Sequence, residues 1–387
     1  MTTFRKIIFW SHLACGLVAG VVIAIMSATG VAIAFEHELL AWIDRDVARV
    51  AIPANAARQP LAELTTIVAA SHPDFHATTI LVPRDPGAAQ TWQMGRDRSL
   101  YVNPYTGAAF APRSGTAHDF LHKLEEWHRW LGAKDGTTSR ARLVTGTCNL
   151  AFLGLCLTGL YLWFPRSWSR RALRPLLWFV GRYRGKSRDF NWHNVLGLWS
   201  APVLIVLVAT GVVISFGWAH ALIFRMAGDP APPFRDFRMM AVAVPALPPS
   251  PGPTAPRLGA DALFAAAIRA FPQWESVGLN LAASAAPDKP ADVVVFEPAP
   301  FATAGRIQTY LDPWRGDVLK KVSFADRSPG LQARVWVRFL HTGEAFGLTG
   351  KIIATLATAA SLVLVWTGFA LSWRRFFMKK PPAAAVG

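Results

Sequence analysis

His12-Leu-Ala-Cys-Gly16 is followed in this chain by Ala28-Thr29-Gly30, and the same pattern returns as His193-Asn-Val-Leu-Gly197 and Ala209-Thr210-Gly211. The histidine and the threonine are 17 residues apart in both copies. A shared apolar composition does not readily reproduce His, Gly and Thr-Gly at one fixed spacing. The pattern therefore predicts a duplicated unit, and repeats of this kind shape the whole fold.

Both copies lie in long apolar stretches that carry almost no charge. A helix needs about 20 apolar residues to cross the hydrocarbon core of a bilayer. Four buried helices of a large soluble protein are the alternative, which is disfavoured because such helices usually keep a polar stripe. We expect an integral membrane α-helical protein with spans at 1–36, 140–165, 191–220 and 341–375, built on the apolar stretches Ile7–Phe35, Leu143–Phe164, Val195–Gly217 and Ile352–Trp373.

The second and fourth spans also match each other. Thr158-Gly-Leu-Tyr-Leu-Trp-Phe-Pro-Arg166 corresponds to Thr367-Gly-Phe-Ala-Leu-Ser-Trp-Arg-Arg375. Upstream of them lie Trp127-His128-Arg-Trp-Leu-Gly132 and Leu340-His341-Thr-Gly343. Each predicted repeat therefore holds two spans, with one histidine in the first span and one just before the second.

The positive charge lies in three segments that flank the spans. The formal net charge is +16, and basic residues gather before the first span, between the second and third, and after the fourth. If the spans alternate, these segments share one side of the membrane, which the positive-inside rule places in the cytoplasm. Both termini, the basic loop 166–190 and the tail 376–387 are thus predicted to be cytoplasmic. Topology accounts for the charge, so no nucleic-acid partner is expected, and the loop can contact anionic headgroups of the lipid bilayer.

The two outer segments, 37–131 and 221–340, each combine a helical pattern with alternating apolar runs. Alternation that ends in Asx-Pro-x-x-Gly is typical of a strand entering a turn. Each segment is therefore expected to form a small α+β unit. The helical patterns are Leu61–Ser71 and Asp261–Ala270, and the turns are Asn103-Pro-Tyr-Thr-Gly107 and Asp312-Pro-Trp-Arg-Gly316.

These segments and spans together resemble a known family. The two Asx-Pro turns resemble those of the PepSY domain, and residues 5–376 are similar to the PepSY-associated transmembrane family. The motifs that carry the likeness are His12…Thr29-Gly30, His193…Thr210-Gly211, His341-Thr-Gly-Glu-Ala-Phe-Gly347 and the Thr-Gly of the second and fourth spans.

The resemblance implies a fold, a location and an activity. It implies four transmembrane helices in two tandem repeats, each with a small α+β PepSY-like periplasmic domain, in the bacterial inner membrane. The family includes inner-membrane reductases of ferric siderophores and other iron-regulated membrane proteins. A haem-containing oxidoreductase is therefore the expected class, although the sequence designates no catalytic residue.

Four histidines fall in two symmetric tiers and are the candidate axial ligands of haem iron. An ionisable side chain inside a bilayer is costly and is a functional candidate by default, and neutral imidazole is a common haem ligand. His12 and His193 lie near the cytoplasmic ends of their spans and can converge on one iron. His128 and His341 precede the second span of each repeat and can hold a second haem on the outer side. We expect two b-type haems, each with two histidine ligands.

Other residues near these tiers leave alternatives open. Gly16 and Gly197, one turn from the inner histidines, either make room for a flat macrocycle or allow close helix packing. His37 and His220 line the outer site, replace one of its ligands, or are interfacial. His118 and His122 are spaced i, i+4, which suits a metal ion and equally suits a solvated helix face. The cationic residues Arg129, Arg338 and Lys351 pair with haem propionates or a ferric chelate, or are ordinary flanking charges.

Missing motifs limit the electron source. No Gly-x-Gly-x-x-Gly follows an expected strand, no Walker A sequence is present, and the cytoplasmic segments are too short for a flavin or nicotinamide domain. No Cys-x-x-Cys-His occurs, so the haem would be non-covalent. The expected partners are a cytoplasmic electron donor or membrane quinol on one side, and a ferric siderophore or other ferric chelate on the other.

Two other functions remain open from the sequence. An iron or haem transporter could use repeats and histidines, but the spans lack the broken helices and intramembrane carboxylates that transport sites often use. A non-enzymatic periplasmic binding or regulatory module anchored by four helices would leave the paired histidines unexplained.

Overall fold

The computed structural model describes residues 3–54, 57–95, 98–134, 138–165, 167–235, 240–252 and 255–378. The chain divides into two compact units, each assembled from separate stretches of sequence. One comprises residues 1–35, 120–223 and 336–387, and the other comprises residues 36–119 and 224–335. Arg166 of the basic loop and residues 379–387 of the tail lie outside the described residues.

The first unit is a bundle of four long helices, α1 (Thr3–Ile33), α5 (Thr138–Trp163), α7 (Gly185–Ser215) and α13 (Gly347–Phe376). Among the described residues, four helical stretches are long and apolar enough to cross a membrane, and each contains one of these helices: Thr3–Ala48, Thr138–Trp163, Gly185–Ser215 and Glu344–Phe376. Their number agrees with the four predicted spans. The shortest, α5, has 26 residues and is about 39 Å long, more than the roughly 30 Å of a hydrocarbon core. The chain is therefore a multi-pass membrane protein.

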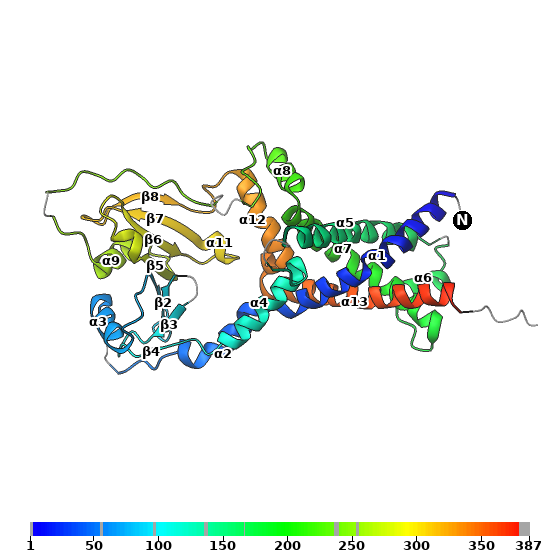
Figure 1. Cartoon of the computed structure of the whole chain (residues 1–387), viewed down its shortest axis with the longest axis horizontal. Helices are drawn as coiled ribbons and strands as arrows, with labels where there is room; N and C mark the ends of the chain where they lie inside the picture. The colour runs from blue at the N-terminus through cyan, green and yellow to red at the C-terminus, as the bar shows by residue number, and fades with distance from the viewer. Residues whose placement is uncertain are drawn as a thin grey trace, which may run out of the picture. The chain divides into compact units, whose positions relative to one another are not determined.

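The bundle is a square in which each helix has two neighbours. α1 packs along α5 and α13, and α7 packs along the same two helices, so α1 and α7 lie diagonally opposite each other. Figure 1 shows the four helices running side by side. A short helix, α6 (Arg170–Leu177), lies between α5 and α7 in the sequence.

Two shorter helices bring the outer histidines to the bundle. His128 lies near the end of α4 (Gly115–Trp130), and His341 near the end of α12 (Pro329–Thr342). Residues 341–375 were expected to be one span, but His341 instead belongs to α12, and the chain turns before α13. The turn depends on Gly343, which has a φ of 77°, and on Gly350, where a Cβ would lie 2.3 Å from the carbonyl oxygen of Gly343. The 3-10 helix η2 (Glu344–Phe346) fills the turn.

The second unit is α+β, as expected, but both outer segments contribute to one eight-stranded antiparallel sheet. Its order is β4-β3-β2-β1-β5-β6-β7-β8. β1 pairs with β5, with Ile80 opposite Leu279, and this pairing joins the two segments. The strands are β1 (Thr79–Pro83), β2 (Gln90–Met94), β3 (Arg98–Val102), β4 (Ala109–Phe110), β5 (Ser276–Asn280), β6 (Ala291–Phe296), β7 (Arg306–Leu311) and β8 (Val318–Val322).

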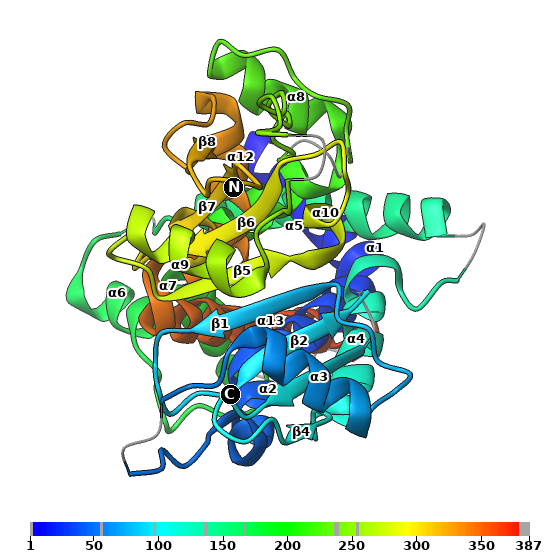
Figure 2. The ribbon, with the colours of Figure 1, turned by 90° about the vertical axis from the view of Figure 1, so that its left-hand side faces the viewer.

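Helices α3 (Leu61–Ser71) and α9 (Ala260–Ala270) contact each other and lie on one face of the sheet (Figure 2). Strands β1, β3 and β6 alternate between buried and less buried side chains, so one face supplies the apolar core, whereas β5 and β7 are buried along most of their length. The core is built around the fully buried side chains Leu64, Val68, Ile80, Trp92, Val277, Leu279 and Val293. The remaining helices of this unit are α2 (Glu36–Ala48), α10 (Leu281–Ser284) and α11 (Ala302–Gly305), and the division between the two units falls within α8 (Gly217–Met226).

The structure confirms the two predicted Asx-Pro turns. The side chain of Asn103 accepts a hydrogen bond from the backbone N–H of Tyr105 at 2.8 Å, and Asp312 accepts one from Trp314 at the same distance. Gly107 ends the first turn with a φ of 72°, and a Cβ there would lie 2.6 Å from Ile67 of α3. The glycine is therefore required both by backbone conformation and by close packing.

Asp261 of α9 links the helices contributed by the two segments. Its carboxylate accepts hydrogen bonds from the backbone N–H groups of Leu61, at 2.6 Å, and Ala62, at 3.1 Å. Pro60, at the N-cap position of α3, gives no side-chain cap. Asp261 therefore caps a helix that lies 200 residues earlier in the sequence.

We expect Asp261→Ala to destabilise the sheet unit by about 1–2 kcal/mol, because the N-terminus of α3 loses its cap. Thermal unfolding in detergent, followed by circular dichroism, measures the change. Asp74→Asn, at an exposed position outside any helix or strand, is the control and should stay within about 0.5 kcal/mol of the parent. Equal stability of the two variants would contradict the proposed cap.

Candidate functional site

The two inner histidines meet across the centre of the bundle. His12 on α1 and His193 on α7 have ring centroids 6.5 Å apart, with planes inclined at 85°. His12 Nδ1 lies 2.9 Å from the hydroxyl oxygen of Thr158 on α5, and His193 Nδ1 lies 2.9 Å from that of Thr367 on α13. The diagonal helices thus supply the imidazoles, and the other two helices hold them.

The two outer histidines form a second pair in the same unit. The ring centroids of His128 and His341 are 6.3 Å apart. His128 Nδ1 lies 2.8 Å from the carbonyl oxygen of Met26 and 3.3 Å from the hydroxyl of Thr29, both on α1.

His341 makes the corresponding contacts on α7. Its Nδ1 lies 2.8 Å from the carbonyl oxygen of Leu207 and 3.3 Å from the hydroxyl of Thr210. The two outer histidines are therefore held at the same pair of distances by different helices.

One short sequence therefore holds each of the four imidazoles. It consists of an apolar residue, two variable residues, threonine and glycine, and we call it the Thr-Gly clamp. The hydroxyl of the threonine faces Nδ1, and the glycine lies next to the ring. The four clamps are Met26–Gly30 for His128, Leu155–Gly159 for His12, Leu207–Gly211 for His341 and Leu364–Gly368 for His193.

The clamps fix the tautomer of each ring. A carbonyl oxygen only accepts hydrogen bonds, so Nδ1 of His128 and of His341 must carry the proton. The hydroxyl of Thr158 donates its own hydrogen to the carbonyl oxygen of Gly154 at 2.6 Å, and that of Thr367 donates to Val363 at 2.8 Å. Each hydroxyl oxygen then accepts from Nδ1–H of its histidine. All four rings therefore keep the lone pair on Nε2.

The clamp glycines allow the close approach of the rings. A Cβ on Gly159 would lie 3.3 Å from Cε1 of His12, and one on Gly30 or Gly211 would lie 3.2 Å from Cε1 of the outer histidines. Such contacts are tighter than packed side chains normally make, so alanine would push the ring away. Gly368 differs, because its Cβ would stand at an ordinary 3.8 Å from His193.

Gly16 and Gly197 are not needed for helix packing. A Cβ at either position would meet only a leucine methyl at 3.8 Å, from Leu155 and Leu364 respectively. This ordinary contact favours the interpretation that these glycines leave space beside the imidazoles.

The residues fit haem. A metal–imidazole bond is about 2.0–2.1 Å, and with about 1 Å from nitrogen to ring centre, two imidazoles on one metal have centroids about 6 Å apart. The observed 6.5 and 6.3 Å agree with this spacing. A porphyrin supplies four nitrogen ligands itself, so two imidazoles that keep the lone pair on Nε2 could supply the remaining two. A histidine ligand whose other nitrogen donates a hydrogen bond is the usual arrangement at protein metal sites.

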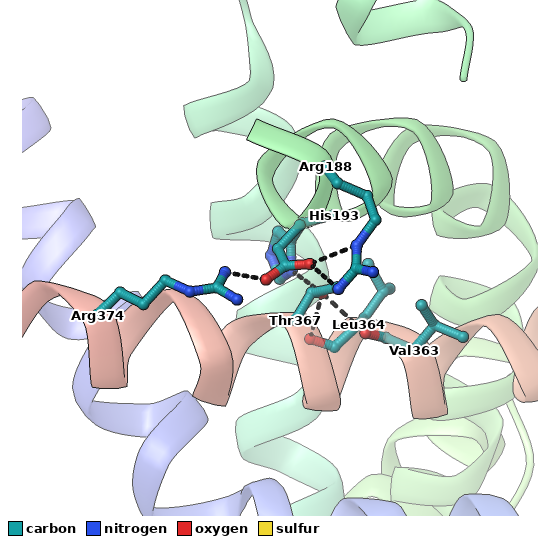
Figure 3. Close-up of polar contacts among 7 residues, drawn as sticks. Arg188, His193, Val363, Leu364, Thr367 and Arg374 are labelled. Atoms are coloured by element: carbon teal, nitrogen blue, oxygen red, sulfur yellow. Dashed lines mark hydrogen bonds and ion pairs between the residues drawn. The ribbon is translucent and has the colours of Figure 1, made fainter. Parts of the chain in front are cut away.

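A buried ion pair locks α7 to α13 beside the inner pair. Asp189, one turn before His193, has a fully buried side chain. Its carboxylate accepts hydrogen bonds from Arg188 at 2.9 and 3.0 Å and from Arg374 of α13. Figure 3 shows this cluster next to the His193–Thr367 hydrogen bond.

Aromatic rings complete the cluster. The Arg188 guanidinium lies 5.4 Å from the ring centre of Trp192 and 5.3 Å from that of Trp366. Because loss of one member would leave a buried charge unpaired, the cluster holds the two helices in one register.

The other predicted histidines lie outside the two pairs. His37 is exposed and belongs to α2, in the sheet unit, and His220 is buried within α8. His118 and His122 are more than half exposed, with Nδ1 at 3.6 Å from Asp119 and 3.8 Å from Glu126. These contacts are typical of a solvated helix face.

Two of the three cationic residues predicted near the outer pair, Arg129 and Lys351, have protein partners. Arg129 is bonded to Glu125 at 2.7 Å and lies over the ring of Trp130. Lys351 is 4% exposed, 3.5 Å from the carboxylate of Glu344. Pairing of these cations with propionates or a ferric chelate stays a prediction.

Sequence reasoning missed the role of the four threonines and of Asp189. The Thr-Gly pairs stood out at fixed spacing, but only as marks of the repeat, because their contacts cross between helices. Asp189 was visible as the lone acid in a strongly basic segment. A single acidic residue among many basic ones indicates that it pairs with a neighbouring cation.

Comparisons with known proteins agree with the resemblance. The family described as PepSY-associated TM region matches residues 9–375. A search of curated proteins finds no match. Since the family match covers nearly the whole chain, this protein belongs to the family of the PepSY-associated TM region.

Proposed function

We propose that this protein is a transmembrane di-haem reductase that passes electrons across the bacterial inner membrane to a ferric siderophore or another ferric chelate. The observation that carries the proposal is the pair of histidine tiers in which every Nδ1–H is engaged and every Nε2 keeps its lone pair. When bound, each haem would supply an iron that takes up and gives away one electron. The chain's own residues hold the imidazoles, fix their tautomer and keep them within the bundle.

The spacing of the tiers supports transfer across the membrane. His128 is bonded to the carbonyl of Met26, fourteen residues along α1 from His12, and His341 is bonded to Leu207, fourteen residues along α7 from His193. At 1.5 Å per residue the two tiers are about 21 Å apart along the helices. The two sites together therefore extend over much of the hydrocarbon core.

A tandem duplication explains why both tiers have the same construction. In each proposed repeat, the first span carries an inner histidine and the clamp for an outer one, and the second span carries the clamp for an inner histidine. One repeat alone supplies a single imidazole to each tier. Two repeats facing each other complete both tiers, which supports the duplication inferred from the sequence.

The direction of transfer follows from the charge pattern. The basic residues before α1, between α5 and α7, and after α13 support cytoplasmic termini under the positive-inside rule. His12 and His193 then form the tier nearer the cytoplasm. Electrons enter there from a separate cytoplasmic donor or a membrane quinol, and leave from the outer tier. One electron converts Fe(III) in the chelate to Fe(II), which hard oxygen ligands hold less tightly, so the iron is released in the periplasm.

Haem content of histidine variants tests the ligands. The purified protein should carry two b-type haems, and His12→Ala with His193→Ala should leave one, because the inner iron loses both protein ligands. Haem quantification and the reduced-minus-oxidised spectrum measure this. His128→Ala with His341→Ala should remove the other haem, and the exposed His76→Ala should keep both. Two haems in both double variants would exclude these four residues as ligands.

Reduction of a ferric chelate across a sealed membrane tests the activity. Proteoliposomes with a reductant inside should form Fe(II) outside, detected with an impermeant ferrous chelator. Both double histidine variants should lower the rate of Fe(II) formation to that of empty liposomes, because loss of either haem interrupts electron transfer. Uptake of labelled iron without any reductant would instead favour a transporter.

Reporter fusions test the topology. A fluorescent protein at the C-terminus should be active, and alkaline phosphatase at that position inactive, because the tail follows the basic end of α13. Phosphatase fused within residues 240–252, in the outer segment, should be active. The opposite pattern would reverse the proposed direction of electron transfer.

A further inference from the structure

We infer that the hydroxyls of Thr158 and Thr367 set the reduction potential of the inner site, whereas backbone carbonyls set that of the outer site. The inference rests on the proposed function, since it concerns haem held by the two histidine tiers. It assigns different roles to threonines that occupy the same position of the same clamp.

The four clamps differ in the atom nearest to Nδ1. In the inner tier this atom is the hydroxyl oxygen, at 2.9 Å from both His12 and His193. In the outer tier it is the carbonyl oxygen of Met26 or Leu207, at 2.8 Å, and the hydroxyls of Thr29 and Thr210 stand further off at 3.3 Å. The difference is the same in both halves of the chain, so it belongs to the tier rather than to one helix.

The acceptor on Nδ1 controls how strongly Nε2 donates to iron. A hydrogen bond from Nδ1–H places negative charge on the imidazole, which makes it a more basic ligand. A more basic ligand favours Fe(III) over Fe(II) and lowers the reduction potential, and hydrogen bonding around the ligand is one of the protein's main means of setting that potential. Loss of the acceptor should therefore raise the potential.

In the inner tier the nearest acceptor belongs to a side chain, and for His193 the backbone carbonyl of Leu364 is a further acceptor. Replacement of Thr158 and Thr367 by valine keeps the shape of the side chain and removes the nearest acceptor of each inner histidine. The shift from the two valines should therefore come mainly from Thr158. The same replacement at Thr29 and Thr210 leaves the carbonyl acceptors of Met26 and Leu207 in place, because no side-chain substitution removes a backbone carbonyl. A side-chain substitution can therefore remove the nearest acceptor of Nδ1 in the inner tier but not in the outer tier.

The chain provides a matched control for structural effects. Each of the four threonine hydroxyls also donates to the carbonyl four residues earlier in its own helix, at 2.6 to 2.8 Å. Valine removes that bond equally at all four positions. A difference between the two tiers then reports on the imidazole acceptor alone.

The experiment is an optical redox titration of the purified protein and two double variants, Thr158→Val with Thr367→Val and Thr29→Val with Thr210→Val. The histidine double variants assign each midpoint potential to its tier. We expect the inner pair of substitutions to shift the inner midpoint upward and leave the outer one in place. The outer pair should shift the outer midpoint less than the inner pair shifts the inner one, because the nearer carbonyl acceptors of Met26 and Leu207 remain. Serine at positions 158 and 367 should restore the parent value, because it keeps the hydroxyl.

The remaining outcomes distinguish failure of this inference from failure of the di-haem proposal. Selective loss of the inner haem in the inner valine variant overturns the inference, because the hydroxyls then hold the ligand rather than set its potential. Unmoved midpoints in that variant, or equal shifts or equal losses in both tiers, overturn the inference while the di-haem proposal stands. A parent protein without haem overturns both.

Discussion

The bundle depends on how it satisfies four imidazoles inside a membrane. A polar ring in hydrocarbon is costly unless its hydrogen-bonding groups have partners. Here each Nδ1–H is donated to a neighbouring helix, so every histidine ties two helices together: α1 with α5, α7 with α13, α4 with α1 and α12 with α7. The same four hydrogen bonds that stabilise the helix contacts also set the ring tautomer that the proposed haem ligation requires. Packing and ligand chemistry therefore cannot be separated in this unit.

In each Thr-Gly clamp, the threonine bonds the imidazole and the glycine makes room for it. Threonine satisfies the ring without introducing a charge, and its hydroxyl hydrogen remains committed to its own helix. Glycine lets the ring lie against the helix, where a methyl group would clash in three of the four clamps. At the inner tier the buried Asp189 adds a charged contact between α7 and α13, one turn from His193. Such a pair adds little net stability but makes the alternative registers expensive.

The sheet unit needs both outer segments to complete its core. Each segment provides four strands and one of the two helices α3 and α9 that pack on the sheet, and the shared core forms only when β1 meets β5. Asp261 extends this dependence, because a carboxylate from one segment caps the helix of the other. A single four-stranded half with one helix would leave an open strand edge and an uncapped helix.

The sequence by itself determined the four spans, the family, the Asx-Pro turns and the positions of the histidines, because hydropathy, fixed spacing and turn chemistry act over short distances. It suggested that His12 pairs with His193 and His128 with His341, and the structure brings these rings together. It did not indicate that the outer segments share one sheet, that His341 ends a helix separate from α13, or that each Thr-Gly clamp serves a histidine on another helix. Only the tertiary structure decided these points, because they depend on contacts between residues 99 to 200 positions apart, which leave no period in the sequence.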